Sequence, residues 1–229
     1  AETMLEPLAA TTDPVALASV SDNVLDGYRA TAPHLREKPG SEVLIVSHGG
    51  QSIALYAAQA ALALGASRVD FASTDDEMLA HAKRIGANPM KTDFGKRPRR
   101  YPIVVDYGLR AEGLDFALRC TEREGICQSV SFYFTPMTMP LGKLYTLGIR
   151  FYVGRCHAAA LLPEVIPLIE QGKLRPGEVT TSVVDWEEAP RAYLEPAVTL
   201  GVTRDCPSRR LSALSSSACA SRRRQAGLR

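Results

Sequence analysis

The stretch from Glu42 to Ala66 constrains the fold more than any other part of the chain. It begins with an apolar run, Val43–Val46, which has the length and mostly β-branched composition of a strand buried on both faces. A polar turn with glycines follows, and then about three and a half turns of alanine-rich helix that end at Gly65. Because Arg68–Ala72 has the pattern of a second strand, the stretch predicts a right-handed βαβ unit.

The glycine turn between the first strand and the helix is a candidate binding site. Gly49 and Gly50 let the backbone approach a ligand closely, and the helix start near Ser52 offers unpaired N–H groups and a positive dipole end. A dinucleotide pyrophosphate is the usual occupant of such a turn. The G-x-G-x-x-G pattern is incomplete, however, because serine stands at two of its glycine positions, 47 and 52. A tight turn without any ligand is the competing interpretation.

The rest of the chain alternates helix and strand patterns, which indicates an α/β fold with a doubly wound parallel sheet. Helices are expected at residues 15–20, 24–32, 74–85, 111–121, 141–147, 158–171 and 186–193. Further strands are expected at residues 101–105, 125–134, 149–153 and 178–184. The helix after the second strand has the clearest start, because Thr74 as N-cap and Glu77 three residues later form a capping box.

The composition is that of a soluble globular protein, with 45% hydrophobic and 23% charged residues among 229. A net charge of +2 argues neither for nor against a nucleic-acid partner. The basic run Lys96–Arg100 contains no aromatic residue and is interrupted by Pro98, so a solvated loop is preferred over a nucleic-acid contact. No apolar run approaches the roughly 18 residues that a membrane span needs. We therefore expect neither nucleic acid nor membrane as a partner.

The chain termini and the cysteines bear on the cellular setting. The N-terminus has no signal-peptide pattern and no initiator Met, so we expect the chain to begin inside a longer one. The five cysteines are scattered without a C-x-x-C pair, which favours reduced thiols in a cytoplasmic protein. Cys156 and His157 are adjacent, but neighbours on a strand point to opposite faces and are poorly placed to share a metal. Residues 204–229, rich in Ser, Ala and Arg, are expected to be a disordered basic tail.

Three words within residues 42–108 carry a family resemblance: LGASRV, DDEMLAHAKRIGA and YPIVVDYG. They are similar to words of the medium-chain, zinc-dependent alcohol dehydrogenases, where a GxGxxG–LxAAQxAxxxGA helix is followed by an E(R/K)LxxAxxLGA helix and a VVxDxxG strand. The resemblance covers about residues 1–203 and is looser after residue 125. The segment SDNVLDGYRA at 21–30 is similar to the one that precedes the cofactor domain in formaldehyde- and threonine-dehydrogenase-like members.

The resemblance implies an oxidoreductase that transfers hydride between an alcohol or aldehyde and NAD(P), with zinc polarising the oxygen. It implies a Rossmann-type NAD(P)-binding domain at 33–175, a catalytic-domain remnant at 1–32 and a return segment to that domain at 176–203. Asp22 matches a zinc ligand of the family, but the Cys position and the GHE motif that supply the other ligands are missing here. Because a catalytic zinc keeps three protein ligands, Asp22 is expected to be a remnant ligand and the chain to bind no zinc. Helix capping is an equal alternative for Asp22.

The resemblance also assigns the cofactor contacts. The expected pyrophosphate contacts are Gly49, Gly50, Gln51 and Ser52; Ser73 and Thr74 are expected to meet the adenosine ribose, and Asp106 and Gly108 to line the cleft. NAD-specific members hold the ribose with an acidic residue at the position where this chain has Ser73. The serine therefore slightly favours NADP over NAD as the cofactor. No arginine stands beside Ser73 to hold a 2′-phosphate, and a decayed nucleotide site stays open as an alternative.

Two further interpretations come from the same turn and from the sheet edge. Gly50-Gln51-Ser52 follows the layout of a nucleophile elbow, which would make Ser52 the nucleophile of a serine hydrolase, with Asp106 and His157 as the ordered partners. Against this, hydrolases place the oxyanion loop and the elbow on separate loops. A pseudoenzyme or oligomerisation module would keep the fold and lose the site. Dehydrogenases of this type often dimerise through the cofactor domain, and residues 149–153 are a suitable edge strand for a homodimer.

Overall fold

The protein is built around a six-stranded parallel sheet, described by a computed structural model that covers residues 8–9, 12–49, 52–97 and 99–204. The sheet has the strand order β3-β2-β1-β4-β5-β6, in which every neighbouring pair is parallel. The strands are β1 (Glu42–Ser47), β2 (Arg68–Ser73), β3 (Asn88–Lys91), β4 (Tyr101–Tyr107), β5 (Thr121–Ser129) and β6 (Arg150–Val153). This is the order 3-2-1-4-5-6 of a Rossmann-type doubly wound fold, so the predicted fold class is confirmed.

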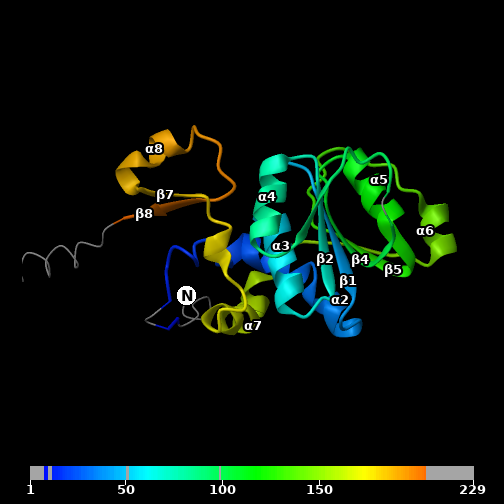
Figure 1. The fold of residues 1–229 in the computed structure, drawn as a ribbon, viewed down its shortest axis with the longest axis horizontal. Coiled ribbons are helices and arrows are strands. Elements are labelled where there is room, and N and C mark those ends of the chain that lie inside the picture. Colours follow the sequence, from blue (N-terminus) through cyan, green and yellow to red (C-terminus); the bar gives the residue numbers. More distant parts are fainter. Residues whose placement is uncertain (1–7, 10–11, 50–51, 98, 205–229) are drawn as a thin grey trace, which may run out of the picture.

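Helices cover both faces of the sheet (Figure 1). One face carries α1 (Leu25–Arg29), α2 (Ala32–Glu37), α3 (Ser52–Ala63), α4 (Asp76–Arg84) and α7 (Ala158–Glu170). The other face carries α5 (Ala111–Cys120) and α6 (Leu141–Leu147). Successive residues of β1 serve the two faces in turn: Val43 and Ile45 pack in the first core, Leu44 and Val46 in the second, all fully buried.

The alanine-rich composition of α3 allows a close crossing with α1. A Cβ atom built on Gly27 would lie 2.6 Å from the backbone nitrogen of Ala57 and 2.7 Å from the Cβ of Tyr56. Small side chains on α3, including Ala54, Ala57 and Ala58, are fully buried there. The helix backbones therefore approach each other at a distance that larger side chains would prevent.

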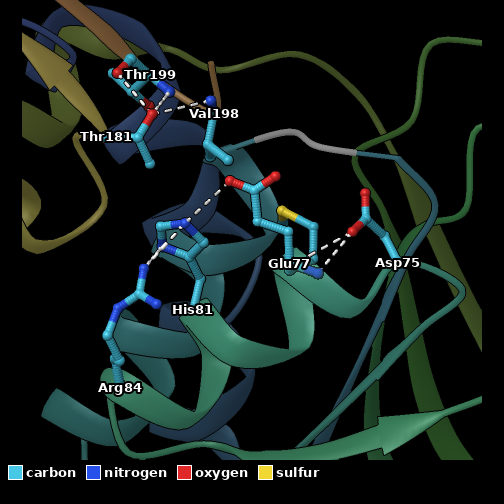
Figure 2. Close-up of polar contacts among 8 residues, drawn as sticks. Asp75, Glu77, His81, Arg84, Thr181, Val198 and Thr199 are labelled. Carbon is cyan, nitrogen blue, oxygen red and sulfur yellow. Dashed lines mark hydrogen bonds and ion pairs between the residues drawn. The ribbon is translucent and has the colours of Figure 1, made fainter. Parts of the chain in front are cut away.

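The N-terminal prediction of two helices was wrong in its details. Residues 14–19 form turns instead of a helix, and a π-helix, η2 (Val20–Val24), leads directly into α1. The N-cap prediction for α4 was also wrong, because Asp75 and not Thr74 caps it: Asp75 Oδ1 accepts hydrogen bonds from the backbone N–H of Glu77 at 2.8 Å and of Met78 at 3.4 Å (Figure 2).

Strand β3 was missed in the sequence, and β5 was placed too late. β3 has four residues and contains Pro89, a residue that a sheet tolerates on edge strands such as this one. β5 runs over Thr121–Ser129, whereas the prediction was 125–134. The strand starts earlier because Thr121 already pairs with Tyr101 of β4, and the register then shifts so that Ile103 pairs with Ile126.

Residues 176–203 form a separate two-stranded sheet with short helices. A 3₁₀ turn, η3 (Pro176–Glu178), precedes β7 (Ser182–Asp185), which pairs in parallel with β8 (Leu200–Thr203). Between these strands lie η4 (Trp186–Glu188) and α8 (Ala189–Ala192). Figure 1 shows this two-stranded sheet and α8 to the left of the six-stranded sheet. Residues 205–229, the predicted tail, lie outside the described residues. In the described ranges, no helix is long and apolar enough to cross a membrane.

Candidate functional site

The carboxyl ends of β1, β2 and β4 meet at one edge of the sheet. Ser47 at the end of β1 stands in register with Ser73 of β2 on one side and Tyr107 of β4 on the other. The strand order reverses between β1 and β4, which makes this edge the topological switch point where open α/β sheets bind ligands. The turns that follow these three strands therefore form the candidate site.

The turn after β1 is held open by its backbone. His48 N–H donates to the carbonyl of Tyr107 at 3.1 Å, which ties the turn to the end of β4. Gly49 has a φ of 79°, and a Cβ atom built on it would meet nothing within 4 Å. The left-handed conformation and the open space beside Gly49 allow a phosphate group of a ligand to lie close to the backbone of the turn. Gly50 and Gln51 lie outside the described residues.

Ser52, the first residue of α3, is buried and already has a side-chain partner. Its Oγ accepts a hydrogen bond from Asn23 Nδ2 at 3.0 Å, and its exposed fraction is 4%. Asn23 belongs to η2, so this contact joins the N-terminal segment to the start of α3. The sequence did not single out Asn23, because a contact over 29 residues leaves no local pattern.

The turn after β2 brings Thr74 to the turn after β1. Thr74 Oγ1 lies 3.3 Å from His48 Nδ1, which links the two turns through their side chains. Ser73 is fully buried, and its Oγ accepts a hydrogen bond from Asp75 N–H at 3.1 Å. The hydroxyl of Ser73 thus supports the turn, while Thr74 stands closer to its surface.

A lysine that the sequence did not single out stands beside this turn. Lys91 is in register with Ser73, and its Nζ donates to the carbonyl of Thr74 at 2.9 Å and to Asp76 Oδ1 at 2.8 Å. No arginine stands beside Ser73 in the sequence, but the neighbouring strand β3 supplies a cation, Lys91. The signal was hidden because β3 itself was not predicted.

Asp106, at the end of β4, organises the neighbouring loops from a fully buried position. Its Oδ2 accepts from Ser129 Oγ at 2.6 Å and from Tyr133 OH at 2.7 Å, and its Oδ1 accepts from Gly108 N–H at 2.9 Å. Burial raises the pKa of Asp106, although these donated hydrogen bonds oppose the shift. The carboxyl group therefore joins the ends of β4 and β5 and the loop at residue 133.

The proposed hydrolase residues are not brought into contact. Ser52 Oγ pairs with Asn23, and Asp106 is surrounded by donors from Ser129, Tyr133 and Gly108. His157 is exposed at the N-cap of α7. Within the described part of the chain, none of the hydrogen bonds of Ser52 or Asp106 involves a histidine, whereas a nucleophile needs a base within reach.

No metal centre is formed by the residues that the structure describes. Asp22 is exposed on η2, and no group of three or more His, Cys, Asp or Glu side chains lies together in these ranges. Cys156 precedes α7 in a loop, so the sequence argument that placed Cys156 and His157 on a strand was wrong. The described residues therefore do not fit a catalytic zinc, which needs three protein ligands.

Comparison with known proteins identifies the fold. No family model matches the chain, and no curated protein matches it by sequence. Among solved structures, the alcohol dehydrogenase of Thermus sp. ATN1 is similar with a TM-score of 0.77 and 22% identity, over 87% of this chain and 62% of that one. A protein of E. coli CFT073 described as a short chain alcohol dehydrogenase, solved with the cofactor NADH, gives a TM-score of 0.72 and 17% identity, over 86% of this chain and 61% of that one.

A third structural neighbour is a zinc-dependent enzyme. It is zinc-dependent alcohol dehydrogenase 2 from Streptococcus pneumonia, with a TM-score of 0.71 and 19% identity, over 82% of this chain and 56% of that one. The chain spans less than two thirds of the length of each of these structures. Over that span, the protein has the fold of the zinc-dependent alcohol dehydrogenases.

Proposed function

We propose that this chain is the dinucleotide-binding part of an oxidoreductase of the zinc-dependent alcohol dehydrogenase family. One observation carries the proposal: an open, left-handed glycine turn stands at the β1–β4 switch point of a 3-2-1-4-5-6 sheet. That is where dinucleotides bind in this fold class. The dehydrogenase neighbours, one of them solved with NADH, support it.

The residues at this edge fit a dinucleotide. Gly49 offers an unobstructed backbone, and α3 begins directly beyond the turn, so its unpaired N–H groups suit a pyrophosphate. The proposed pyrophosphate contacts are Gly49, Gly50, Gln51 and Ser52. Asp106 and Gly108 are proposed to line the nicotinamide side of the cleft. When bound, the cofactor supplies the chemistry of hydride transfer, and the chain's residues bind and orient it.

The adenosine end is proposed to lie over Thr74, with a slight preference for NADP. Ser73 brings no negative charge to the end of β2, and Lys91 Nζ is within hydrogen-bond distance of the carbonyl of Thr74. A 2′-phosphate at this turn would meet a cation instead of a carboxylate. Asp76 shares that lysine, so the phosphate would compete with an existing ion pair.

The substrate, the cellular location, the domain limits and the dimer of the whole enzyme are also proposed from the similarity to the alcohol dehydrogenases. Its substrate would be a small alcohol or aldehyde, in a cytoplasmic protein without nucleic-acid or membrane partners. Residues 1–32 and 176–203 would belong to the catalytic domain and residues 33–175 to the NAD(P)-binding domain. The described residues supply too few ligands for zinc, so no step of the reaction is assigned to this chain. A homodimer would form through β6, an edge strand whose Val153 is 69% exposed.

Nucleotide binding by the purified chain tests the proposal. Trp186 is 53% exposed and sits on η4, so thermal shift and calorimetry are better readouts than its fluorescence. Ligand at about 100 times Kd should add roughly 2.7 kcal/mol to the free energy of unfolding. No saturable binding of NAD⁺ or NADP⁺ up to millimolar concentration would contradict the proposal and favour a module without a working nucleotide site.

A matched pair of glycine variants locates the binding. Gly49→Ala adds a methyl group where the cofactor backbone would lie, and we expect it to weaken binding at least about tenfold, or 1.4 kcal/mol. Gly40→Ala is the control, since Gly40 has a similar φ of 70° and equally open space but stands before β1, at the opposite edge. Equal weakening in both variants would mean that backbone strain, not a ligand contact, is measured.

A further inference from the structure

A second candidate binding site is a cavity of about 580 Å³. Among the described residues, those that line it are cationic: Lys96, Arg97, Arg99, Arg100, Arg119 and Lys143. They come from the loop before β4, from the last turn of α5 and from α6. Their spacing in the sequence conceals the cluster, because Arg119 and Lys143 join the basic run only in the folded chain.

The cavity lies at the edge of the sheet opposite to the glycine turn. Arg100 directly precedes the first residue of β4, and Arg119 stands two residues before the first residue of β5. The glycine turn follows the carboxyl end of β1, beside the carboxyl end of β4. At about 3.3 Å per residue, the seven residues of β4 separate the two edges by roughly 20 Å.

Backbone carbonyls fix the arginines of the cavity without cancelling their charge. Arg119 donates to the carbonyls of Phe94 at 2.7 Å and Gly95 at 2.8 Å. Arg100 donates to the carbonyl of Thr121 at 2.9 Å, and Arg97 to that of Arg119 at 3.4 Å. These neutral acceptors hold the three guanidinium groups in place, and the carbonyls that hold Arg97 and Arg100 leave the positive charge of both side chains for another partner.

Carboxylates balance only part of this charge. Arg119 pairs with Asp115 at 2.6 Å, and Arg99 with Glu42 at 2.8 Å. Among the residues that the structure describes, no carboxylate pairs with Lys96, Arg97, Arg100 or Lys143. Positive side chains that lie close together repel each other. A bound multivalent anion would reduce this repulsion.

We propose that this cavity binds a compact small molecule with two or more phosphate groups. Arginine recognises phosphate oxygens with paired N–H groups, and the lysines add point charges. The described lining residues include no aromatic side chain on which a base could stack, and the charge is gathered in a hollow instead of a stripe, which argues against nucleic acid. The site is independent of the dinucleotide proposal, since it shares no residue with the glycine turn.

Calorimetric titration of the whole chain with tripolyphosphate, at low and at physiological salt, tests the proposal. We expect one saturable site, and ATP should bind no more tightly than tripolyphosphate because the lining has no partner for its base. Lys96→Glu with Lys143→Glu should weaken binding at least about tenfold, because each substitution replaces a charge-assisted hydrogen bond to phosphate with charge repulsion. Gly49→Ala, which weakens nucleotide binding at the glycine turn, should leave the affinity for tripolyphosphate unchanged, because Gly49 does not line the cavity.

The control is a double variant that changes the net charge by the same amount but at surface positions away from the cavity. Lys83→Glu with Lys173→Glu alters exposed lysines on α4 and after α7, both on the far face of the sheet, and should change the affinity less than about twofold. Equal losses in both double variants would reduce the effect to net charge and overturn the proposal. Absence of saturable binding at low salt would overturn it too, as would tighter binding of a duplex oligonucleotide than of tripolyphosphate.

Discussion

Gly108 and Gly113 lie in direct backbone contact across the start of α5. A Cβ atom built on Gly108 would lie 2.7 Å from the Cα of Gly113, and one built on Gly113 would lie 2.6 Å from the Cα of Gly108. Gly108 also donates its N–H to Asp106, so the contact fixes the turn after β4 where that carboxyl group is buried. Helix packing thus requires glycine at position 108 whether or not a cofactor lies over it.

Replacing Gly113 by alanine should destabilise the protein. The added methyl group meets backbone atoms that cannot rotate away, and overpacking of this kind costs about 1–3 kcal/mol. Gly142→Ala in α6 is the control, because its Cβ would meet nothing within 4 Å and alanine favours a helix by about 1 kcal/mol. Urea unfolding of both variants measures the difference. Equal stability of Gly113→Ala and Gly142→Ala would show that the turn after β4 rearranges to accommodate the added methyl group.

Ser52 should not react as a hydrolase nucleophile. Its Oγ accepts from Asn23, and in the described part of the chain no histidine forms a hydrogen bond with it and could take its proton. We therefore expect no covalent adduct with a fluorophosphonate probe, measured by intact-protein mass spectrometry beside an active serine hydrolase as positive control. An adduct on Ser52 that disappears in Ser52→Ala would refute this and revive the hydrolase interpretation.

Lys91 should contribute to the choice between NADP and NAD. Because its Nζ reaches the turn after β2, Lys91→Ala should weaken NADP⁺ binding about fivefold to tenfold while NAD⁺ changes less than twofold. Lys83→Ala, an exposed lysine in the last turn of α4, is the control. If the affinities for both nucleotides fall together in Lys91→Ala, the lysine supports the turn and does not select the phosphate.

His34 should make the protein less stable in mild acid. It is 5% exposed and lies 3.0 Å from Gln128 Oε1, and burial lowers its pKa while Gln128 opposes the shift. Since the unfolded chain takes up a proton near pH 6.5 and the folded chain only at lower pH, the free energy of unfolding falls as pH falls below about 6.5. The loss is about 1.4 kcal/mol for each unit by which the two pKa values differ.

The variant His34→Gln keeps a polar side chain and removes the titration. Urea unfolding at pH 7 and pH 5 should show a smaller loss of stability in the variant than in the parent chain. His81 has a pKa lowered by burial as well and remains in both proteins, so its share cancels in the difference. An identical loss in parent and variant would show that His34 does not titrate in this range.

The sequence predicted the centre of the fold better than its margins. β1 and α3 are buried segments whose apolar residues and turn glycine are local, so their pattern identified them and the switch-point turn. Asp75 displaced Thr74 as N-cap because two adjacent residues could both cap, and only the folded turn decides between them. Lys91 and the contact between Asn23 and Ser52 depend on sheet register and on long-range packing, which no local pattern records.

The exposed edge of β6 should mediate self-association. β6 ends the sheet, and Val153 on it is 69% exposed, while Phe132 and Phe134 in the loop after β5 are 71% and 89% exposed. An edge strand and exposed apolar side chains both favour association with a second copy. Val153→Lys should therefore convert a dimer to a monomer in sedimentation analysis. Val183→Lys, an exposed valine on β7, should leave the dimer intact. A dimer that survives Val153→Lys, or a parent chain that is monomeric at micromolar concentration, would exclude this edge as the interface.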